Sequence, residues 1–158
     1  MSEAIPPRPR QSIGKRIFPI VASQYNPRYV QGLVDHACEE LRSLCPAAAL
    51  TLHQVPGAFE IPVVVRELAI QKKADAIIAV GVILKGGTTH AEHIASSVSN
   101  ALQQIAIEYG VPVINAVLSV NNEEQARERC LEEKLNRGIE AARAAVDVAN
   151  VMLELRER

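Results

Sequence analysis

Residues 76–84 read AIIAVGVIL, a run whose apolar side chains fall on both faces of an extended segment. Such a strand has to be covered on both sides, which is typical of the central strand of a parallel sheet between two layers of helices. The segment 89–109 then repeats apolar residues at steps of three and four and is closed by Gly110 and Pro112, which predicts a long helix. Together these segments form one strand-helix unit of an α/β fold.

The same alternation continues on either side of this unit. Further strands are expected at 17–22, 50–55 and 111–120, and further helices after Pro27, at 60–71, from 122 to about 133 and from 138 to about 155. We therefore predict a three-layer αβα sandwich with a flavodoxin-like, four-stranded parallel sheet and helices on both faces. Residues 1–16 are expected to form an N-terminal arm, and residues 17–158 a single domain.

Local signals refine three of these boundaries. Pro19 has no N–H to donate, so the first strand is expected to be paired irregularly or on one side. Asn26 followed by Pro27 predicts a helix cap and a first-turn proline. Asn122 with Gln125 three residues later predicts a capping box at the start of another helix.

The composition excludes several classes of partner. The 158 residues hold 17 Lys and Arg against 18 Asp and Glu, so no net basic field attracts nucleic acid or an anionic membrane. Aromatic residues are 3% of the chain and Trp is absent, which excludes a base-stacking surface. The three cysteines form no CxxC motif and are expected to be buried thiols. Without a leader or an apolar run of about 20 residues, the chain is predicted to be cytoplasmic.

Unusual residues gather in the loops that leave the predicted strands. The three loops are 23–26 (SQYN), 56–60 (PGAFE) and 85–90 (KGGTTH). In an open parallel sheet, ligands bind outside the carboxyl ends of the strands. We therefore expect these loops to meet at one site.

The glycine-rich loop is the strongest candidate for an anion site. Residues 86–89, GGTT, open a helix whose unpaired N–H groups and positive dipole end favour a phosphate, although the glycines could simply permit a tight turn. His90 follows directly and is a candidate proton shuttle. The stretch 81–88, GVILKGGT, also approaches the nucleotide-binding pattern GxxxxGK[ST], but its lysine is misplaced. Nucleotide hydrolysis is therefore the weaker hypothesis.

Aromatic and charged side chains near these loops each have two interpretations. Tyr25 and Phe59 are suited to stacking on a flat heterocycle, while core filling explains Phe59 equally well. Glu60 either stabilises a helix start or accepts hydrogen bonds from a polyol. His93 is expected to share a helix face with His90. One basic residue of the last third is a candidate phosphate clamp, and spacing alone leaves open which: Arg127, Arg129, Lys134 or Arg137.

Five ordered blocks then cover most of the chain: VPGAFEIP at 55–62, GVILKGGTTH at 81–90, GVPVINAVLS at 110–119, EEQARER at 123–129 and NRGIEAA at 136–142. In order and content they resemble the lumazine synthase family, across roughly residues 17–152. The resemblance implies a transferase of the penultimate step of riboflavin biosynthesis that needs no cofactor and no metal. It would condense 5-amino-6-(D-ribitylamino)uracil with 3,4-dihydroxy-2-butanone 4-phosphate to 6,7-dimethyl-8-ribityllumazine, releasing phosphate and water.

The resemblance also implies a role for individual residues. Tyr25 would stack on the pyrimidine, and His90 would act as general acid and base. Arg129 would clamp the phosphate, while Gly87 and Thr88 would bind it through their backbone N–H groups. The ring and the ribityl chain would be held by residues of one loop and one strand: Ala58, Phe59, Glu60, Val82, Ile83 and Leu84.

Three departures from the family pattern bear on this site. Asn115 stands where the family commonly has an aromatic residue that covers the heterocycle. Residues 91–93, AEH, replace an aromatic-acidic-aromatic run. Arg137 stands where the family has a lysine, and is expected to assist by its charge. These departures motivate a second hypothesis, a catalytically weak relative that binds a flavin or ribityl compound or forms a shell.

The resemblance further implies a homo-oligomer. Its unit would be a pentamer with sites at subunit interfaces, present alone, as a decamer, or as twelve pentamers in a sixty-subunit icosahedral capsid. The N-terminal arm would add to the sheet of an adjacent subunit, and riboflavin synthase is a candidate protein partner. Small-molecule substrates are the expected ligands, and no nucleic-acid or membrane partner is expected.

Overall fold

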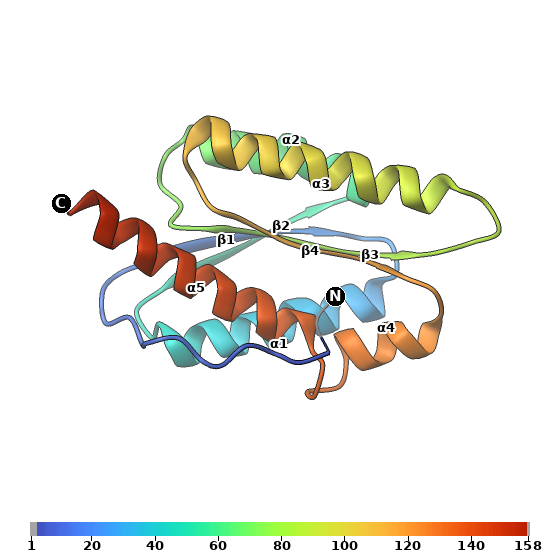
Figure 1. The fold of residues 1–158 in the computed structure, drawn as a ribbon, viewed down its shortest axis with the longest axis horizontal. Coiled ribbons are helices and arrows are strands. Elements are labelled where there is room, and N and C mark those ends of the chain that lie inside the picture. The colour runs from blue at the N-terminus through green and yellow to red at the C-terminus, as the bar shows by residue number, and fades with distance from the viewer. Residues whose placement is uncertain (1–2, 158) are drawn as a thin grey trace.

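The computed structural model describes residues 3–157, which form a parallel four-stranded sheet between two layers of helices (Figure 1). The strands are β1 (Ile17–Ser23), β2 (Ala49–Val55), β3 (Ile77–Leu84) and β4 (Val113–Val120), in the order β2-β1-β3-β4. The helices are α1 (Pro27–Leu44), α2 (Ile61–Ile70), α3 (His90–Tyr109), α4 (Glu123–Cys130) and α5 (Arg137–Arg156), with a short 3₁₀ turn η1 (Ala58–Glu60) before α2. The predicted three-layer fold with a flavodoxin-like sheet is confirmed.

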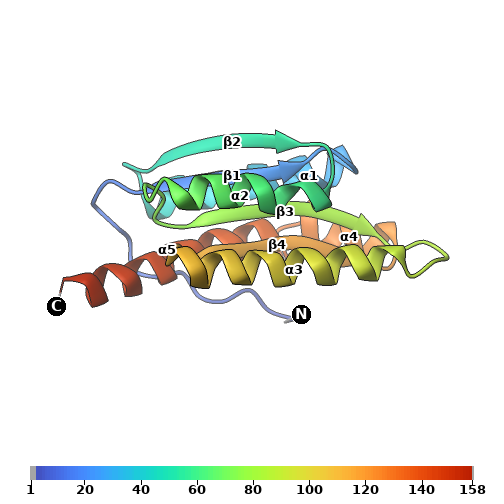
Figure 2. The same ribbon diagram turned by 90° about the horizontal axis from the view of Figure 1, so that it is seen from above.

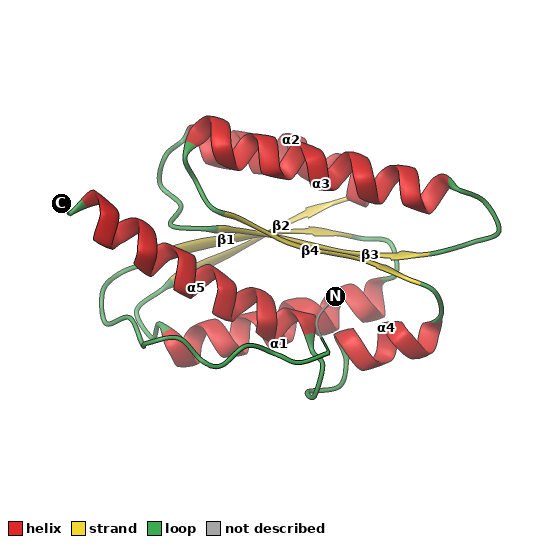
Figure 3. Ribbon diagram, in the orientation of Figure 1, coloured by secondary structure: helices red, strands yellow, loops and turns green. Residues whose placement is uncertain are grey.

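Two apolar cores hold the layers together. Helices α2 and α3 cover one face of the sheet, and α1, α4 and α5 cover the other (Figure 3). On β3, Ile77 and Ala79 face the α2–α3 core, whereas Ile78 and Val80 face the α1–α5 core, and all four are buried. Burial on both faces is the reason that this strand is a continuous apolar run, and the prediction of a central strand is confirmed.

Figure 2 shows the four strands in the order β2, β1, β3, β4, and their pairing is uneven along the sheet. β1 pairs with β2 over its whole length, and β3 pairs with β4 as far as Leu84 and Val120. β1 pairs with β3 only from Ile20 to Ala22, so this ladder begins just after Pro19, as the missing N–H of proline predicts. At their carboxyl ends β1 and β3 are no longer paired. The strand order also reverses between them, which is where open sheets bind ligands.

Several predicted boundaries need correction. Asn26 precedes α1, with Pro27 in its first turn, but its side chain makes no capping hydrogen bond. α4 ends at Cys130 rather than near 133, because the N–H groups of residues 131 and 132 both turn back to the Arg127 carbonyl. α5 begins one residue earlier than predicted. Its cap is Asn136, whose Oδ1 accepts hydrogen bonds from the N–H groups of residues 138 and 139.

The capping box before α4 is formed in part. Asn122 Oδ1 accepts a hydrogen bond from the Gln125 N–H at 2.9 Å, as predicted. The Gln125 side chain, however, accepts from the N–H of Asn121 at 2.8 Å, one residue before the cap. The helix start is therefore correct, and the reciprocal bond is shifted by one position.

The N-terminal segment lies against α1 and α5 of its own chain. Arg8 pairs with the buried Glu40 at 2.7 Å, and Arg143 donates to the Pro6 carbonyl at 2.6 Å. The Ser12 N–H donates to the Leu44 carbonyl at 3.0 Å. Figure 1 shows the segment following the lower helical layer, so in this chain it does not extend the sheet.

The three cysteines lie inside the fold or at its edge and form no disulfide bond. Cys45 and Cys130 are buried, Cys38 is half-buried, and all three are free thiols. Burial raises the pKa of each thiol, that of Cys130 to about 12.

Among residues 3–157, no helix is long and apolar enough to cross a bilayer.

Candidate active site

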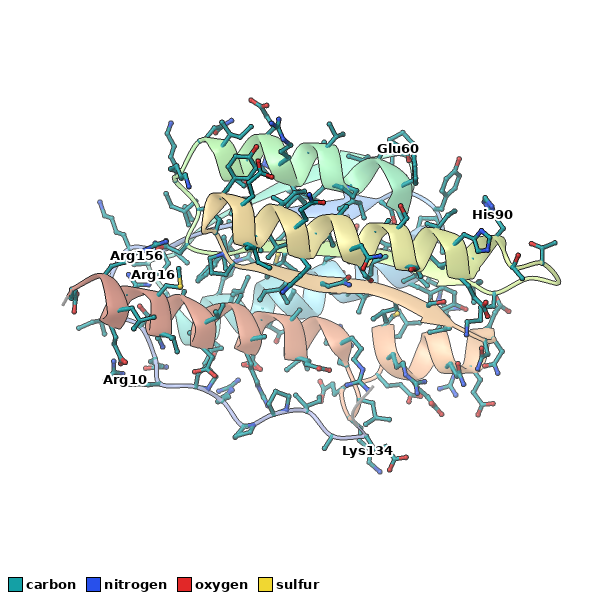
Figure 4. The ribbon with its side chains drawn as sticks, turned by 45° about the horizontal axis from the view of Figure 1, so that its top comes forward. Arg10, Arg16, Glu60, His90, Lys134 and Arg156 are labelled. Carbon is teal, nitrogen blue, oxygen red and sulfur yellow. The ribbon has the colours of Figure 1, made fainter. Side chains whose placement is uncertain are left out.

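A cavity of about 740 Å³ lies at the carboxyl edge of the sheet, over the point where β1 and β3 separate. Its lining comes from the loops after β1 and β2, from the end of β3 and from the first turns of α3. Figure 4 shows Glu60 and His90 at this end of the molecule. The residues around it are Ser23, Tyr25, Asn26, Pro56, Gly57, Ala58, Phe59, Glu60, Val82, Ile83, Leu84, His90, His93, Ile94 and Ser97.

The predicted pyrimidine and ribityl residues of these loops are brought together here. Tyr25 and Phe59 are 68% and 65% exposed in the single chain, so core filling does not explain either ring. A Cβ atom on Gly57 would lie 2.9 Å from Tyr25 Cε2, so the glycine leaves room for this ring against the backbone of the next loop. The two loops after β1 and β2 therefore form one wall with two aromatic rings available to a ligand.

Glu60 stabilises the turn that forms part of this wall. Its Oε2 accepts a hydrogen bond from the Gly57 N–H at 2.9 Å, which closes the 3₁₀ turn before α2. The Glu60 side chain is exposed in the single chain. The bond holds the carboxylate at the cavity, where it can accept further hydrogen bonds from ligand hydroxyl groups.

The end of β3 forms the floor of the cavity. Val82 is buried, and Ile83 and Leu84 are half-buried. The Val82 carbonyl accepts a hydrogen bond from Asn26 Nδ2 at 2.8 Å, across the gap between β3 and the loop after β1. Asn26 has left-handed backbone angles, with φ 56° and ψ 55°. The loop 23–26 was expected at the site, but Asn26 was expected to cap the helix, and its bond to Val82 was not predicted.

The glycine-rich loop lies beside the cavity rather than in its lining. Neither Gly86 nor Gly87 has a positive φ, and a Cβ on either would meet no atom within 4 Å. Steric need for a tight turn therefore does not explain these glycines. Thr88 Oγ1 lies 3.4 Å from the His90 backbone nitrogen, which donates to it at the start of α3. The loop presents exposed backbone at a helix N-terminus, the arrangement that favours a phosphate.

One face of α3 supplies the opposite wall. His90, His93, Ile94 and Ser97 all line the cavity, and their spacing is that of one side of a helix. His90 is exposed and can exchange protons with a bound ligand. Helical periodicity starting from His90 is the signal that could have added Ile94 and Ser97 to the predicted site.

Three predicted site residues lie elsewhere in the single chain. Asn115 is on the edge strand β4, where its Nδ2 donates to Ser99 Oγ at 3.0 Å and its Oδ1 accepts from the Val117 N–H at 3.0 Å. With Arg137 it lines a separate hollow of about 130 Å³ between β4 and α5. Arg129 belongs to α4, on the opposite side of the sheet from α3. Within residues 3–157, none of the three contributes to the 740 Å³ cavity.

The guanidinium of Arg129 differs from those of its basic neighbours in the distance to its acidic partner. Arg127 pairs with Glu132, and the buried Arg137 pairs with Glu140. Arg129 forms an ion pair with Glu128 at 3.7 Å, which is longer than a hydrogen bond, and its Nε and Nη1 atoms are buried without a hydrogen-bond partner among residues 3–157. Buried N–H groups of a guanidinium are costly to leave unsatisfied, so Arg129 is suited to an anion brought from outside the chain.

Comparison with known proteins supports the resemblance. Two relatives named 6,7-dimethyl-8-ribityllumazine synthase, from Nitratidesulfovibrio vulgaris strains DP4 and Hildenborough, are each 40% identical over 139 residues, 87% of this chain and 89% of theirs. A solved structure, the N. crassa QDE-2 AGO MID domain, has 15% identity and a TM-score of 0.37 over 89% of this chain and 97% of its own, which is too low to bear on the fold. The family model for 6,7-dimethyl-8-ribityllumazine synthase matches residues 15–153. The chain belongs to the 6,7-dimethyl-8-ribityllumazine synthase family.

Proposed function

We propose that this chain catalyses the condensation of 5-amino-6-(D-ribitylamino)uracil with 3,4-dihydroxy-2-butanone 4-phosphate at the 740 Å³ cavity, giving the lumazine, phosphate and water. The family assignment supports a transferase of riboflavin biosynthesis. The observation that carries the proposal is the gathering of Tyr25, the 58–60 turn, the end of β3 and His90 around one cavity. These elements come from four separate parts of the sequence.

The chemistry asks for positioning and proton transfer. The imine forms between the amine of the pyrimidine and the carbonyl of the ketone, so no side chain has to act as a nucleophile. Holding two reactants in register can itself supply much of the acceleration. His90, at the mouth of the cavity, would move the protons that imine formation, loss of phosphate and ring closure require.

The heterocycle and its ribityl chain fit the part of the cavity that a single chain provides. The rings of Tyr25 and Phe59 can pack on the pyrimidine, and the backbone of 82–84 offers hydrogen bonds to its edge. Glu60, held by Gly57, can accept from ribityl hydroxyl groups. The exposed backbone at 86–88 would receive the phosphate.

We also propose that a second copy of the chain completes the site. Asn115, Arg129 and Arg137 lie outside the cavity of their own chain, and Arg129 holds buried N–H groups suited to an anion. A pentamer with sites between subunits would bring these residues to a neighbour's cavity. Higher assembly, a contact with riboflavin synthase and a cytoplasmic location stay predictions, as does the division into an arm at 1–16 and a domain at 17–158.

The test of the activity is direct. Purified protein is mixed with the two substrates and lumazine formation is followed by absorbance and fluorescence, beside His90→Ala and a control without protein. The control is needed because the substrates condense slowly unaided. We expect formation well above the control, with most of it lost in the variant. Background-level formation together with tight binding of the pyrimidine would instead favour the catalytically weak, ligand-binding hypothesis.

The shared site has its own test. His90→Ala and Arg129→Ala are each expected to be impaired, and the two are then co-assembled in equal amounts. If His90 and Arg129 of one site come from different subunits, about a quarter of the sites regain both groups. Recovery of activity toward that fraction supports the shared site. Activity that stays at the mean of the two variants contradicts it.

A further inference from the structure

The gap between β1 and β3 leaves backbone groups of the cavity floor, the Val82 carbonyl among them, beyond the end of the β1–β3 ladder. The N–H groups of Ile77 and Lys85 point to the β4 side, where they donate to the Pro112 and Val120 carbonyls at 2.9 Å. Backbone groups alternate in direction along a strand, so those of Val82 point to the β1 side. The pairing of β1 with β3 ends at Val80, two residues earlier. The Val82 carbonyl therefore lies where the ladder has stopped.

The Asn26 side chain supplies the hydrogen bond that a neighbouring strand would otherwise donate to the Val82 carbonyl. Its Nδ2 donates to the Val82 carbonyl at 2.8 Å, although 56 residues separate the two in sequence. A residue before a helix ordinarily has an extended backbone and accepts a hydrogen bond from the first turn. In Asn26 the backbone is left-handed, with φ 56°, and the side chain makes no capping bond; its backbone carbonyl accepts from the N–H groups of Tyr29 and Val30 instead. Asparagine tolerates this left-handed conformation better than most residues, and the conformation directs its amide across the gap.

The bridge connects the two parts of the cavity that face each other. Tyr25 is the preceding residue and lies over Gly57, so the position of its ring depends on the conformation of Asn26. Val82 begins the 82–84 floor. Below the bridge the strands are held close: a Cβ on Gly81 would lie 3.1 Å from the hydroxyl of the buried Ser23. Above it, the Asn26 bond links the loop after β1 to the end of β3.

We propose that Asn26 is a positioning residue for the pyrimidine substrate, which sets the spacing between the Tyr25 ring and the 82–84 backbone by bridging the open end of the sheet. This inference rests on the proposed function for the choice of substrate. Its specific consequence is that loss of the bridge weakens binding of the flat heterocycle more than that of the phosphorylated ketone. The glycine-rich loop, which receives the phosphate, has no bond to Asn26 among those the structure shows.

Asn26→Asp is the sharpest variant. Aspartate has the same size and also tolerates the left-handed backbone, but its carboxylate has no proton to donate and faces a carbonyl oxygen. We expect KM for the pyrimidine to rise by about tenfold or more, with KM for the ketone phosphate changed by less than about threefold. Asn122→Asp is the matched control. It adds the same charge at the cap of α4, where the side chain only accepts a hydrogen bond, from the Gln125 N–H. This variant is expected to behave as the unmodified chain.

Acid rescue separates positioning from a general structural role. With an ordinary aspartate pKa of about 3.9, about a fifth of the introduced carboxyl is protonated at pH 4.5, against almost none at pH 7.5, and the protonated form can donate to the Val82 carbonyl. Fluorescence titration with the pyrimidine is therefore expected to show the binding defect shrinking from pH 7.5 to 4.5, relative to Asn122→Asp at each pH. If aspartate prevents folding, Asn26→Gly removes the donor alone, since glycine accepts φ 56° without strain, and the same KM split is expected.

The outcomes distinguish the two proposals. Equal increases in KM for both substrates, or unchanged pyrimidine binding in Asn26→Asp and Asn26→Gly, would overturn the positioning role. Failure of the unmodified chain to exceed the protein-free rate would overturn the proposed activity. The role of Asn26 would then be tested by fluorescence titration alone, which measures the affinity of each variant for the pyrimidine. An unmodified chain that turns over substrate while both variants bind the pyrimidine normally would overturn the inference about Asn26 alone.

Discussion

Gly138, near the start of α5, is predicted to be indispensable for the packing of α1 on α5. A Cβ at this position would lie 2.3 Å from the Leu33 carbonyl oxygen, which is a backbone atom of a buried segment of α1. Real contacts of this kind essentially never fall below 3.0 Å, so the two helices have to separate by about 0.7 Å. Helix propensity acts in the opposite direction, because alanine is favoured over glycine by up to about 1 kcal/mol.

The cost of overpacking is expected to exceed the gain in helix propensity. Overpacking of a well-filled core costs about 1–3 kcal/mol, and here the displaced helix also carries the buried Ala141, Ala142 and Ala145. We expect Gly138→Ala to lower the free energy of unfolding by about 2 kcal/mol and Tm by about 6 °C. Urea and thermal unfolding at fixed protein concentration measure both. Gly86→Ala, where a Cβ meets nothing within 4 Å, is the control and is expected to stay within about 0.5 kcal/mol. A Gly138→Ala chain as stable as the control would refute this reasoning.

Further outcomes are expected at three residues. His90→Ala should slow turnover by roughly one to four orders of magnitude with assembly unchanged in light scattering, and full activity would exclude it as the proton shuttle. Arg129→Ala should raise KM for the ketone phosphate far more than KM for the pyrimidine, whereas equal effects would point to misfolding or another clamp. The pKa of Cys130 is raised to about 12 by burial, so its thiol should resist alkylation at pH 8 until the chain unfolds. Because the folded pKa is above the unfolded value near 9, stability from this group should fall as pH rises from 9 to 12, and Cys130→Ala should flatten that fall.

The fold was largely predictable because each element carries its own signal. The continuous apolar run at 77–84 fixed the central strand, and apolar spacing identified α1 and α3 together with Gly110, which caps α3 with φ 65°. The lumazine synthase prediction is confirmed by the family match. The end of α4 was missed because it depends on two N–H groups sharing the Arg127 carbonyl, a choice of geometry that residue types alone do not determine.

The candidate site was predictable in its loops and less so in its connections. The carboxyl-edge rule identified 23–26, 56–60 and 85–90 as the relevant loops; residues of the first two and His90 line the cavity, and 85–89 are not part of its lining. Asn26 was assigned to the helix because Asn-Pro is a strong local capping signal. Its actual bond reaches Val82, and only the end of the β1–β3 ladder at Val80 shows why that carbonyl needs a donor. Long-range satisfaction of a single backbone group leaves no pattern in the sequence.

The topology also explains why one chain holds only part of the predicted site. The loops after β1 and β2, the end of β3 and the start of α3 meet at the point where the strand order reverses, so they form one cavity. α4 follows the edge strand β4 and packs on the α1–α5 side, which puts the sheet between Arg129 and α3. A change of side-chain rotamer moves a guanidinium by a few ångströms and does not carry it through a packed sheet. If Arg129 clamps the phosphate of a substrate held beside His90, the arginine has to come from another copy of the chain, and assembly becomes a condition of catalysis.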